Sequence, residues 1–387
     1  MKSGILEKLK KNSMVVILLA VILVFTILTK GNVLLPQNIN NIISQNAYVI
    51  VLTIGMLFCI LTGGNIDLSV GSIVALVGSL AGVMIVKQKM NIYLTILICL
   101  AVGLLIGAIQ GYLIAYLKAP SFIITLAGMM VWRGLSLVIL QGFTIAPFPS
   151  NYAQLFNSYL PSFKFAELDG VCMIAGVLMV VAYVINAVKN HKAEKEVATG
   201  SDTSTLVFIF ETAMVALGLL FVTYSLAKFR GFPVILILLG LIIFVYHYYA
   251  SKTVNGRHYY AVGGNELAAS LSGIDARKVY FKAYVNSAFL SAVAGLMVVA
   301  RFNSATPTLG DGYEMDAIAA AYIGGASAYG GVGTVWQVVI GAIFMGVLNN
   351  GMSIMGIDAD IQRIVKGVVL AIAVVFDIVS KRRNAAE

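Results

Sequence analysis

A polar, glycine-rich stretch with one carboxylate interrupts a long apolar run between residues 46 and 86. The interruption spans residues 62–69 and reads TGGNIDLS. A lipid bilayer cannot satisfy free backbone amides, so such a stretch is tolerated at membrane depth only where protein buries it or where it lines a cavity. Asp67 adds the cost of a charge in lipid, and ionisable groups at that depth by default indicate a substrate path. The residues therefore indicate a protein that moves a solute across a membrane.

A second set of polar groups interrupts the apolar sequence further along the chain. Residues 303–316 contain Asn303 and Asp316, and we expect this segment to line the route at its outer mouth. Arg133 also falls within an apolar run. Charges at this depth serve either pairing inside the protein or contact with the solute, and the residue types leave both open. The candidate path residues are Gly63, Gly64, Asn65, Asp67, Ser69, Asn303 and Asp316.

The groups that catalysis or cofactor binding would require are missing from the sequence. It contains no GxxxxGK[ST] phosphate loop, no HExxH, no CxxC and no GxSxG. Its histidines and cysteines are dispersed, and the cysteines lie singly in apolar runs, so we predict no catalytic residue, no metal site and no cofactor bound by this chain. The basic residues are scattered over loops, which excludes a nucleic-acid partner. The histidines are His191, His247 and His258, and the cysteines are Cys59, Cys99 and Cys172.

Composition places the chain in a bilayer. It is 60% hydrophobic and only 11% charged, with a mean hydropathy of +0.93, whereas globular proteins carry about 25% charged residues. Because a spanning helix needs about 20 apolar residues, the sequence predicts one all-α, multi-pass membrane domain over residues 1–387. The candidate spans are 14–29, 46–62, 68–86, 92–117, 121–141, 170–188, 205–226, 233–250, 284–301, 314–328, 334–355 and 363–380.

The distribution of lysine and arginine predicts the orientation. With both termini inside, sixteen of the 26 basic residues fall in cytoplasmic segments, as the positive-inside rule requires. Three hydrophilic segments then connect the spans: 142–169 as a periplasmic loop, 189–204 as a cytoplasmic loop and 251–283 as a second cytoplasmic segment. We therefore predict a bacterial inner-membrane protein with cytoplasmic termini.

The third hydrophilic segment contains a short helical pattern bounded by glycines. Residues 266–271 read ELAASL, with Asn265 in position to cap the helix and Gly273 in position to end it. The pattern is typical either of a knob for a cytoplasmic partner or of an ordinary surface helix.

Two short sequence matches indicate an internal duplication. AYV at 47–49 recurs at 283–285, and IGAI at 106–109 recurs at 340–343, with separations of 236 and 234 residues. On the predicted topology each copy runs opposite to its partner. Inverted repeats with broken helices are typical of transporters.

These motifs resemble those of a known family. TGGNIDLSVGS at 62–72, PSFIITL at 120–126, WRGL at 132–135 and GGNELAASLSGI at 263–274 are similar to segments of permease subunits in bacterial ABC importers for monosaccharides, the ribose, xylose and galactose class. The stretch from Arg301 to Gly367 has the strongest resemblance to this family. Within it, the motifs NSATP and NNGMSIMGI are most similar to those of the multiple-aldose or xylose branch. The chain departs from the family in the extra Asn65 and in 170–230, which adds about two spans.

The resemblance implies a fold and a set of partners. The fold would be a permease bundle like that of vitamin B12 importers, with 10–12 transmembrane helices in inverted repeats. A second copy of the chain would complete the path, cytosolic ATPase subunits would bind ATP-Mg and dock below, and an extracytoplasmic sugar-binding protein would dock above. The cargo would be xylose, galactose, arabinose or a similar aldose. The residues expected to couple to the ATPase are Gly263, Gly264, Asn265, Glu266, Ala269, Gly273, Asp275 and Arg277.

Two other classes of protein compete with this interpretation. A proton-coupled secondary sugar transporter would use Asp67 and Asp316 as proton relays, but it would not need the coupling segment. An integral-membrane enzyme would need a catalytic cluster, which the sequence lacks.

Overall fold

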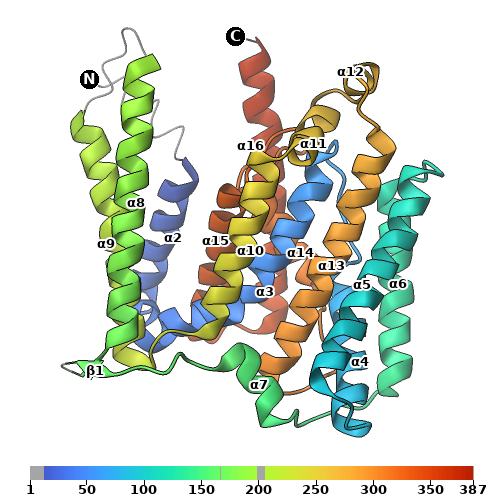
Figure 1. The fold of residues 1–387 in the computed structure, drawn as a ribbon, viewed down its shortest axis with the longest axis horizontal. Coiled ribbons are helices and arrows are strands. Elements are labelled where there is room, and N and C mark those ends of the chain that lie inside the picture. The colour runs from blue at the N-terminus through green and yellow to red at the C-terminus, as the bar shows by residue number, and fades with distance from the viewer. Residues whose placement is uncertain (1–12, 166, 198–204, 387) are drawn as a thin grey trace.

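The computed structural model describes residues 13–165, 167–197 and 205–386. Its helices stand side by side along one direction (Figure 1). The short helix α12 (Glu266–Leu271) lies at one end of the bundle, here called the α12 end, and α7 (Ser150–Asn157) lies at the other, the α7 end. The remaining elements are α2 (Ser13–Leu28), η1 (Asn32–Leu34), α3 (Pro36–Leu61), α4 (Val70–Ala81), η2 (Gly82–Lys87), α5 (Ile92–Ala115), α6 (Ser121–Leu140), β1 (Lys164–Phe165), β2 (Leu168–Asp169), α8 (Gly170–Val197), α9 (Thr205–Phe229), α10 (Val234–Lys252), α11 (Val254–Gly264), α13 (Ala276–Phe302), α14 (Tyr313–Ile323), α15 (Val335–Ile354) and α16 (Ala359–Ala386).

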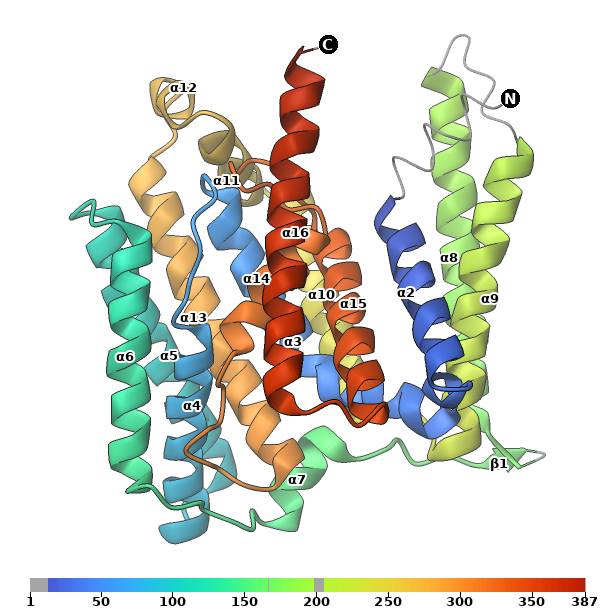
Figure 2. The ribbon, with the colours of Figure 1, turned by 180° about the vertical axis from the view of Figure 1, so that it is seen from behind.

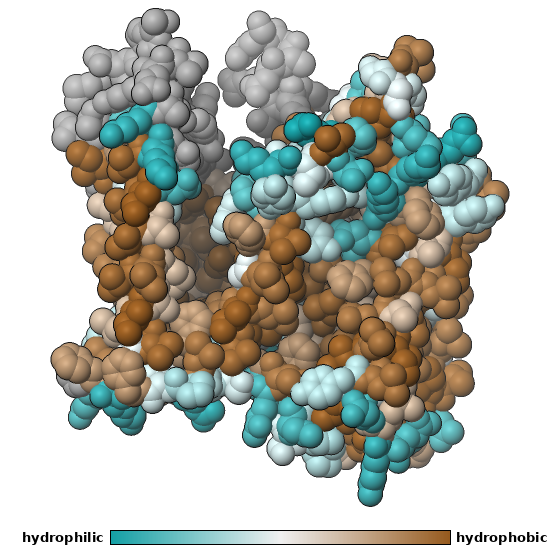
Figure 3. All heavy atoms as spheres, viewed as in Figure 1, coloured by the Kyte–Doolittle hydropathy of each residue, from teal (hydrophilic) through white to brown (hydrophobic). Residues whose placement is uncertain are grey.

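On the face shown in Figure 3, apolar residues form a band across the molecule, with hydrophilic residues at both ends. Among the described residues, nine helices are long and apolar enough to cross a membrane. The windows on α3, α4 with η2, α13 and α15 are 67–78% buried, whereas those on α5, α6, α8, α9 and α10 are 11–28% buried. The core therefore consists of the first group, and the second group turns apolar side chains outward, as a bilayer permits.

Each of the twelve predicted spans coincides with a helix, but one of them was predicted too long. The expected span 314–328 is α14, which ends at Ile323 after 11 residues. At 1.5 Å per residue it is about 16 Å long, roughly half of a hydrocarbon core about 30 Å thick. The remaining residues form irregular backbone because glycines at 324, 325, 330, 331 and 333 follow the helix, four of them with positive φ.

The helices alternate in direction along the chain. The first described residue of α2 and the last of α16 lie at the α12 end (Figures 1 and 2). This agrees with the predicted even number of passes. The side of the membrane on which this end lies stays a prediction.

The two sequence repeats fall on helices that run in opposite directions. AYV lies in α3, which runs toward the α12 end, and recurs in α13, which runs away from it. IGAI lies in α5 and recurs in α15, again with opposite directions. The unit α3–α4–α5 thus matches α13–α14–α15 in inverted orientation, and in each unit the middle helix follows an irregular segment.

Close packing of α5 on α13 joins the two repeats. Gly103, Gly107 and Gly111 lie four residues apart on α5. A Cβ at Gly103 would lie 2.6 Å from the Ala292 Cβ, and one at Gly107 would lie 2.6 Å from the Val285 Cα. Small residues at this spacing let membrane helices approach until their backbones touch. At these glycines the two helices therefore approach until the backbone of α5 meets α13.

The structure refines the three predicted hydrophilic segments. Residues 142–169 contain α7 and the antiparallel pair β1–β2. The expected loop 189–204 is wrong in its first half, because α8 continues to Val197, and residues 198–204 lie outside the described residues. The segment 251–283 is shorter than predicted, because α10 ends at Lys252 and α13 begins at Ala276.

The region 170–230 forms a hairpin of two helices, α8 and α9. It joins the body near the α7 end, where Cys172, Leu226 and Ala227 form a small buried cluster with Ile43 and Leu236 against it. Toward the α12 end the hairpin stands apart from α10 (Figure 3). Its attachment at one end explains why these helices are so exposed.

This arrangement predicts which end faces out of the cell. In a background where Cys59, Cys99 and Cys172 are replaced, Ser162→Cys on the exposed β1 side should react with a membrane-impermeant thiol reagent on intact cells. Ser272→Cys beside α12 should react only after the membrane is permeabilised, because the lysine and arginine bias places the α12 end inside. The reverse labelling pattern would contradict the predicted orientation.

Candidate functional site

The first break begins where α3 ends near the α12 end. Gly63 and Gly64 have φ of 109° and 77°, values that side-chain-bearing residues rarely adopt. The Thr62 hydroxyl donates to the Cys59 carbonyl at 2.7 Å, and the Asn65 amide donates to the Thr62 carbonyl at 3.0 Å. Ser121 at the start of α6 donates to the Asn65 Oδ1 at 2.7 Å. The break is therefore held by its own side chains and by α6, as buried backbone in a bilayer requires.

Asp67 is completely buried at the centre of a hydrogen-bond network. Its Oδ1 accepts from the Ser69 amide at 3.0 Å and from the Ser69 hydroxyl at 2.6 Å, and its Oδ2 accepts from Ser287 on α13 at 2.8 Å. The Ser69 hydroxyl also lies 3.1 Å from the Gln110 Oε1 on α5. These contacts tie the break to both repeats.

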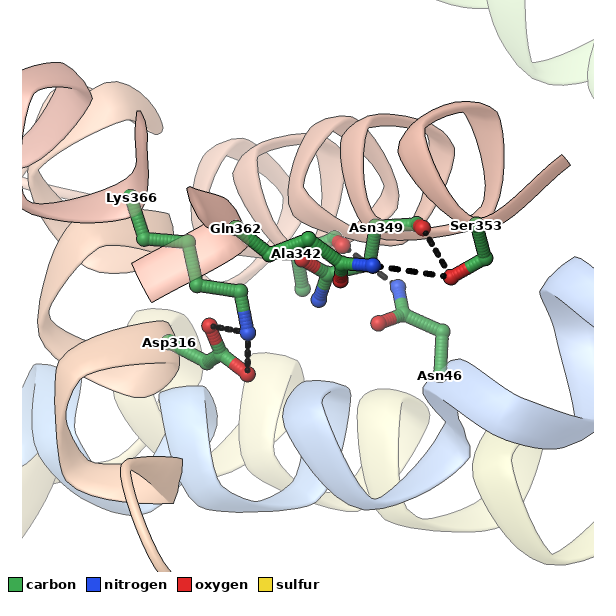
Figure 4. Close-up of polar contacts among 7 residues, drawn as sticks. All are labelled: Asn46, Asp316, Ala342, Asn349, Ser353, Gln362 and Lys366. Atoms are coloured by element: carbon green, nitrogen blue, oxygen red, sulfur yellow. Dashed lines mark hydrogen bonds and ion pairs between the residues drawn. The ribbon is translucent and has the colours of Figure 1, made fainter. Parts of the chain in front are cut away.

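The second break precedes α14, and its charged residue has a partner of its own. The Lys366 ammonium on α16 lies 2.9 Å from Asp316 Oδ1 and 3.1 Å from Oδ2 (Figure 4). Asp316 is 1% exposed, whereas the Lys366 side chain is 21% exposed, so the carboxylate is taken out of water and its cation only partly. In the same view Asn46 on α3 donates to the Ala342 carbonyl on α15, and Gln362 on α16 donates to Ser353 at 3.4 Å. Polar contacts thus connect α16 with α14 and α15, and α3 with α15.

Two arginines hold the loop before α14 near the α7 end. Arg133 on α6 donates to the Leu309 carbonyl, and Arg363 on α16 lies 2.7 Å from Asp311 Oδ2. Asn303 lies further back on the same loop, where its Oδ1 accepts from the Phe148 amide at 2.9 Å. Arg133 is therefore a loop anchor.

The sequence-predicted path residues form separate groups. Asp67 and Ser69 share one network, Gly63, Gly64 and Asn65 lie at its α12 side with partial exposure, and Asp316 belongs to the Lys366 pair. Asn303 lies exposed on the outer loop. Asp67 and Asp316 share no hydrogen-bond or ion-pair partner among the described residues. Their role in a path stays a prediction, while their structural contacts are clear.

The expected coupling segment forms the two short helices α11 and α12. Asn265 caps α12 by accepting from the Ala268 amide at 2.9 Å, and Gly273 at φ 85° follows the helix end, which confirms both expectations. Glu266 accepts from the Tyr280 hydroxyl at 2.9 Å. Ala269 is 6% exposed, so it packs inward. The outward residues that sequence reasoning missed are Leu267 and Leu271, at 71% and 82% exposure; their i, i+4 spacing was the available signal.

Asp275 and Arg277 lie exposed at the start of α13. Asp275 caps this helix by accepting from the Lys278 amide at 3.3 Å, and its carboxylate lies 3.3 Å from the Lys278 ammonium. Desolvation raises the pKa of Asp275, but the hydrogen bonds from Lys278 and the charges of Lys278 and Arg277 outweigh it and leave the pKa below its ordinary value. The cap is therefore ionised at neutral pH.

Backbone contacts between glycines connect the coupling segment to the first break and to the irregular segment that follows α14. We call this contact the glycine junction; it comprises Gly63, Gly64, Gly263, Gly330 and Gly331. A Cβ at Gly263 would overlap the Leu61 carbonyl, and one at Gly330 would overlap Gly63. The Gly331 amide donates to the Leu61 carbonyl at 3.0 Å. The end of α11, the first break and the segment after α14 therefore meet backbone to backbone.

No group of three histidine, cysteine, aspartate or glutamate residues that could hold a metal occurs in the part of the chain that the structure describes. The three cysteines are free and buried. The polar clusters described above consist of amides, hydroxyls and ion pairs, which hold the helices and the breaks in place.

This architecture of broken helices in inverted repeats is that of a membrane permease. Residues 38–374 match the family described as the permease component of branched-chain amino acid transport systems, and the chain belongs to this family. It is 38% identical to the xylose transport system permease protein XylH of Escherichia coli K12 over 371 residues, covering 96% of this chain and 92% of XylH.

Two further relatives extend this comparison. The XylH protein of Haemophilus influenzae is 36% identical over 96% of both chains, and the ribose import permease protein RbsC of Escherichia coli K12 is 30% identical over 95% of this chain and 94% of RbsC. The family expected from the sequence is thereby confirmed. No solved structure matches the chain, so the likeness to vitamin B12 importers stays a prediction.

The buried ion pair predicts a strong effect on stability. Lys366→Met should lower the free energy of unfolding by about 3–5 kcal/mol, because it leaves the Asp316 carboxylate buried without its cation. Asp316→Asn combined with Lys366→Met should recover part of this loss. Arg363→Met, which breaks the exposed pair with Asp311, is the matched control and should cost about 1 kcal/mol or less. Thermal unfolding of the purified protein measures all three, and equal losses for Lys366→Met and Arg363→Met would contradict the assignment.

Proposed function

We propose that this chain is the permease subunit of an ATP-binding-cassette importer that carries a monosaccharide into the cell, with xylose as the first candidate among the aldoses. The observation that carries the proposal is the identity to two xylose permeases over nearly the whole chain. The identity to a ribose permease over a similar length supports the wider sugar class. Galactose and arabinose remain alternatives within that class. The chain lies in the cytoplasmic membrane of a bacterial cell.

The arrangement of the carboxylates argues against a proton-coupled carrier. Asp67 accepts only from serine groups, and Asp316 is paired with Lys366. A relay would need an exchange of protons between such groups along a connected chain. The two aspartates share no hydrogen-bond or ion-pair partner among the described residues. The contacts instead suit a structural role for both.

The α12 end is the docking site for the cytosolic ATPase in this proposal. Leu267 and Leu271 present an apolar surface at the tip of the molecule, with Glu266 and Arg277 exposed beside it. A short helix with apolar anchors at i and i+4 suits insertion into a groove of a partner. ATP-Mg is bound and hydrolysed by that partner.

A second copy of the chain completes the path. Between α6 and α16 the protein presents the segments 62–69 and 303–312 on one face (Figure 2). Met315 and Tyr329 are 47% and 58% exposed. Irregular backbone cannot face lipid, so we place the partner copy over this face and the sugar route between the two copies. The extracytoplasmic sugar-binding protein then docks at the α7 end.

The glycine junction supplies the mechanical connection. A displacement of α12 by the ATPase moves α11, whose last residues contact the backbone of the first break and of the segment after α14. Since these contacts lack side chains that could yield, the movement reaches the segments before α4 and after α14 directly. The first break lines the proposed route, so the opening of the route changes sides when α12 moves.

The junction predicts a coupling defect from one methyl group. In the complete complex, Gly263→Ala should raise the ratio of ATP hydrolysed to sugar imported by about fivefold or more, the equivalent of at least about 1 kcal/mol of overpacking strain. Gly264→Ala is the control, since a Cβ there meets nothing within 4 Å. An unchanged ratio in a normally assembled Gly263→Ala complex would contradict the role of the junction.

The energy source separates the proposed function from its rival. Uptake of D-xylose into vesicles with a fixed internal ATP concentration should persist when a protonophore is added. Asp67→Asn should reduce this uptake by about three- to tenfold, because the amide keeps the shape but weakens the hydrogen bonds to Ser69 and Ser287, and the remaining uptake should also resist the protonophore. Loss of uptake on collapse of the proton gradient would refute the importer.

A further inference from the structure

A cavity of about 260 Å³ lies between helix ends at the α7 end of a single subunit. Its walls come from the first turns of α3, from α7, from the junction of α9 with α10, and from the end of α13. We call this cavity the outer vestibule. Its polar side chains include Gln37, Asn40, Asn41, Ser44, Arg230 and Arg301.

Part of this polar lining is held in place by other protein groups. Asn40, at 5% exposure, donates to the Tyr159 hydroxyl at 3.1 Å. Asn157 donates to the Ala300 carbonyl at 2.7 Å. The guanidinium of Arg230 lies 5.4 Å from the ring centroid of Phe229. The vestibule therefore has a defined wall of amides and aromatic rings.

Other polar groups of the vestibule lack a protein partner. The Arg301 Nε is buried and has no hydrogen-bond partner. The side chains of Gln37, Asn41 and Ser44 make no hydrogen bond to the described residues. Gln37 is exposed and Asn41 and Ser44 are partly exposed, so their donors and acceptors can bind a molecule in the cavity. The buried Arg301 Nε needs such a partner, because buried polar groups are normally satisfied.

The chemistry of the lining selects the class of occupant. Amides and a serine hydroxyl both donate and accept, as the hydroxyls of a sugar do, and Phe156 and Phe229 offer apolar ring surface to its C–H groups. The volume lies just below the usual range for drug-sized ligands, about 300–1,000 Å³, which suits a small molecule. The lining also contains two cations, Arg230 and Arg301, so inorganic phosphate is the competing ligand in the test below.

We propose that the outer vestibule is a monosaccharide-binding subsite within each subunit, separate from the route between the two copies. This inference rests on the proposed function, because it takes the transported sugar as the ligand. Each subunit would hold one sugar on the side that receives it. Part of the wall comes from α9, which gives the α8–α9 hairpin a role in sugar binding.

The inner end of the vestibule is narrow. It continues into a space of about 20 Å³ bounded by Tyr48, Met297 and Arg301. The Tyr48 ring stacks on Tyr313 with centroids 4.1 Å apart, and Tyr48 lies beside Asp316. A sugar in the vestibule is thus stopped before the buried ion pair.

Thiol protection tests the subsite in the complete complex. In a background without the three native cysteines, Ser44→Cys should react with an impermeant methanethiosulfonate reagent from the α7 side. D-Xylose, at a concentration well above the one that half-saturates uptake, should slow this reaction by about threefold or more, because the bound sugar shields the thiol in proportion to its occupancy. Inorganic phosphate should not slow it. Ser162→Cys, at the same end of the molecule but outside the cavity, should react at one rate under all conditions.

A second variant keeps the test independent of the cysteine. Asn41→Ala should raise the KM of uptake by about threefold or more and leave the maximal rate and the ATPase activity unchanged, because this side chain has no protein hydrogen bond to lose. An unreactive Ser44→Cys, a lack of protection by xylose, or protection by phosphate alone would overturn the subsite. So would an unchanged KM in Asn41→Ala. If the subsite fails in these tests but the unmodified complex still imports xylose with ATP, the proposed function stands. If the unmodified complex shows no ATP-driven xylose uptake, that result counts against the proposed function.

Discussion

The structure depends on one constraint: backbone groups that leave a helix inside a bilayer must find partners in the protein. The chain leaves its helices at two such places, before α4 and on both sides of α14. At the first, the side chains of Thr62, Asn65 and Asp67 bond to backbone groups in and just before the break, and Ser121 and Ser287 on neighbouring helices hold the Asn65 and Asp67 side chains in place. The position of the central helices in the core follows from this need, because α3 and α13 must lie beside the break to enclose it.

The two breaks solve the same problem with different chemistry. Hydroxyl and amide groups satisfy the carboxylate of the first, whereas a lysine from α16 neutralises that of the second. A buried ion pair is costly to break but adds little over an apolar contact. Here the pair fixes the position of α16 against α14. It thereby sets the boundary of the face on which both irregular segments lie.

The rigid backbone contacts and the polar groups suited to weak binding lie in different parts of this molecule. The glycine junction and the α5–α13 interface bring backbones together without adjustable side chains, so movement passes through them with little loss. The outer vestibule instead has amides and hydroxyls at partial exposure, which suit transient binding of a neutral solute. An importer needs both, because a stiff connection transmits the work of the ATPase and a loosely binding path releases the cargo.

The residue pattern alone determined the membrane class, the twelve apolar segments, the caps of α12, the inverted duplication and the family. Each of these depends on local composition or on short spacings, which sequence order records directly. The tertiary structure decided which of those residues meet. It paired Asp316 with Lys366, 50 positions away, and Asp67 with Ser287, 220 positions away. In the tertiary structure Ala269 is buried and Leu267 is exposed, and α14 ends after 11 residues. These outcomes depend on how helices pack around irregular backbone in a medium that offers no other hydrogen-bond partners. The periodicity of the sequence does not determine that packing.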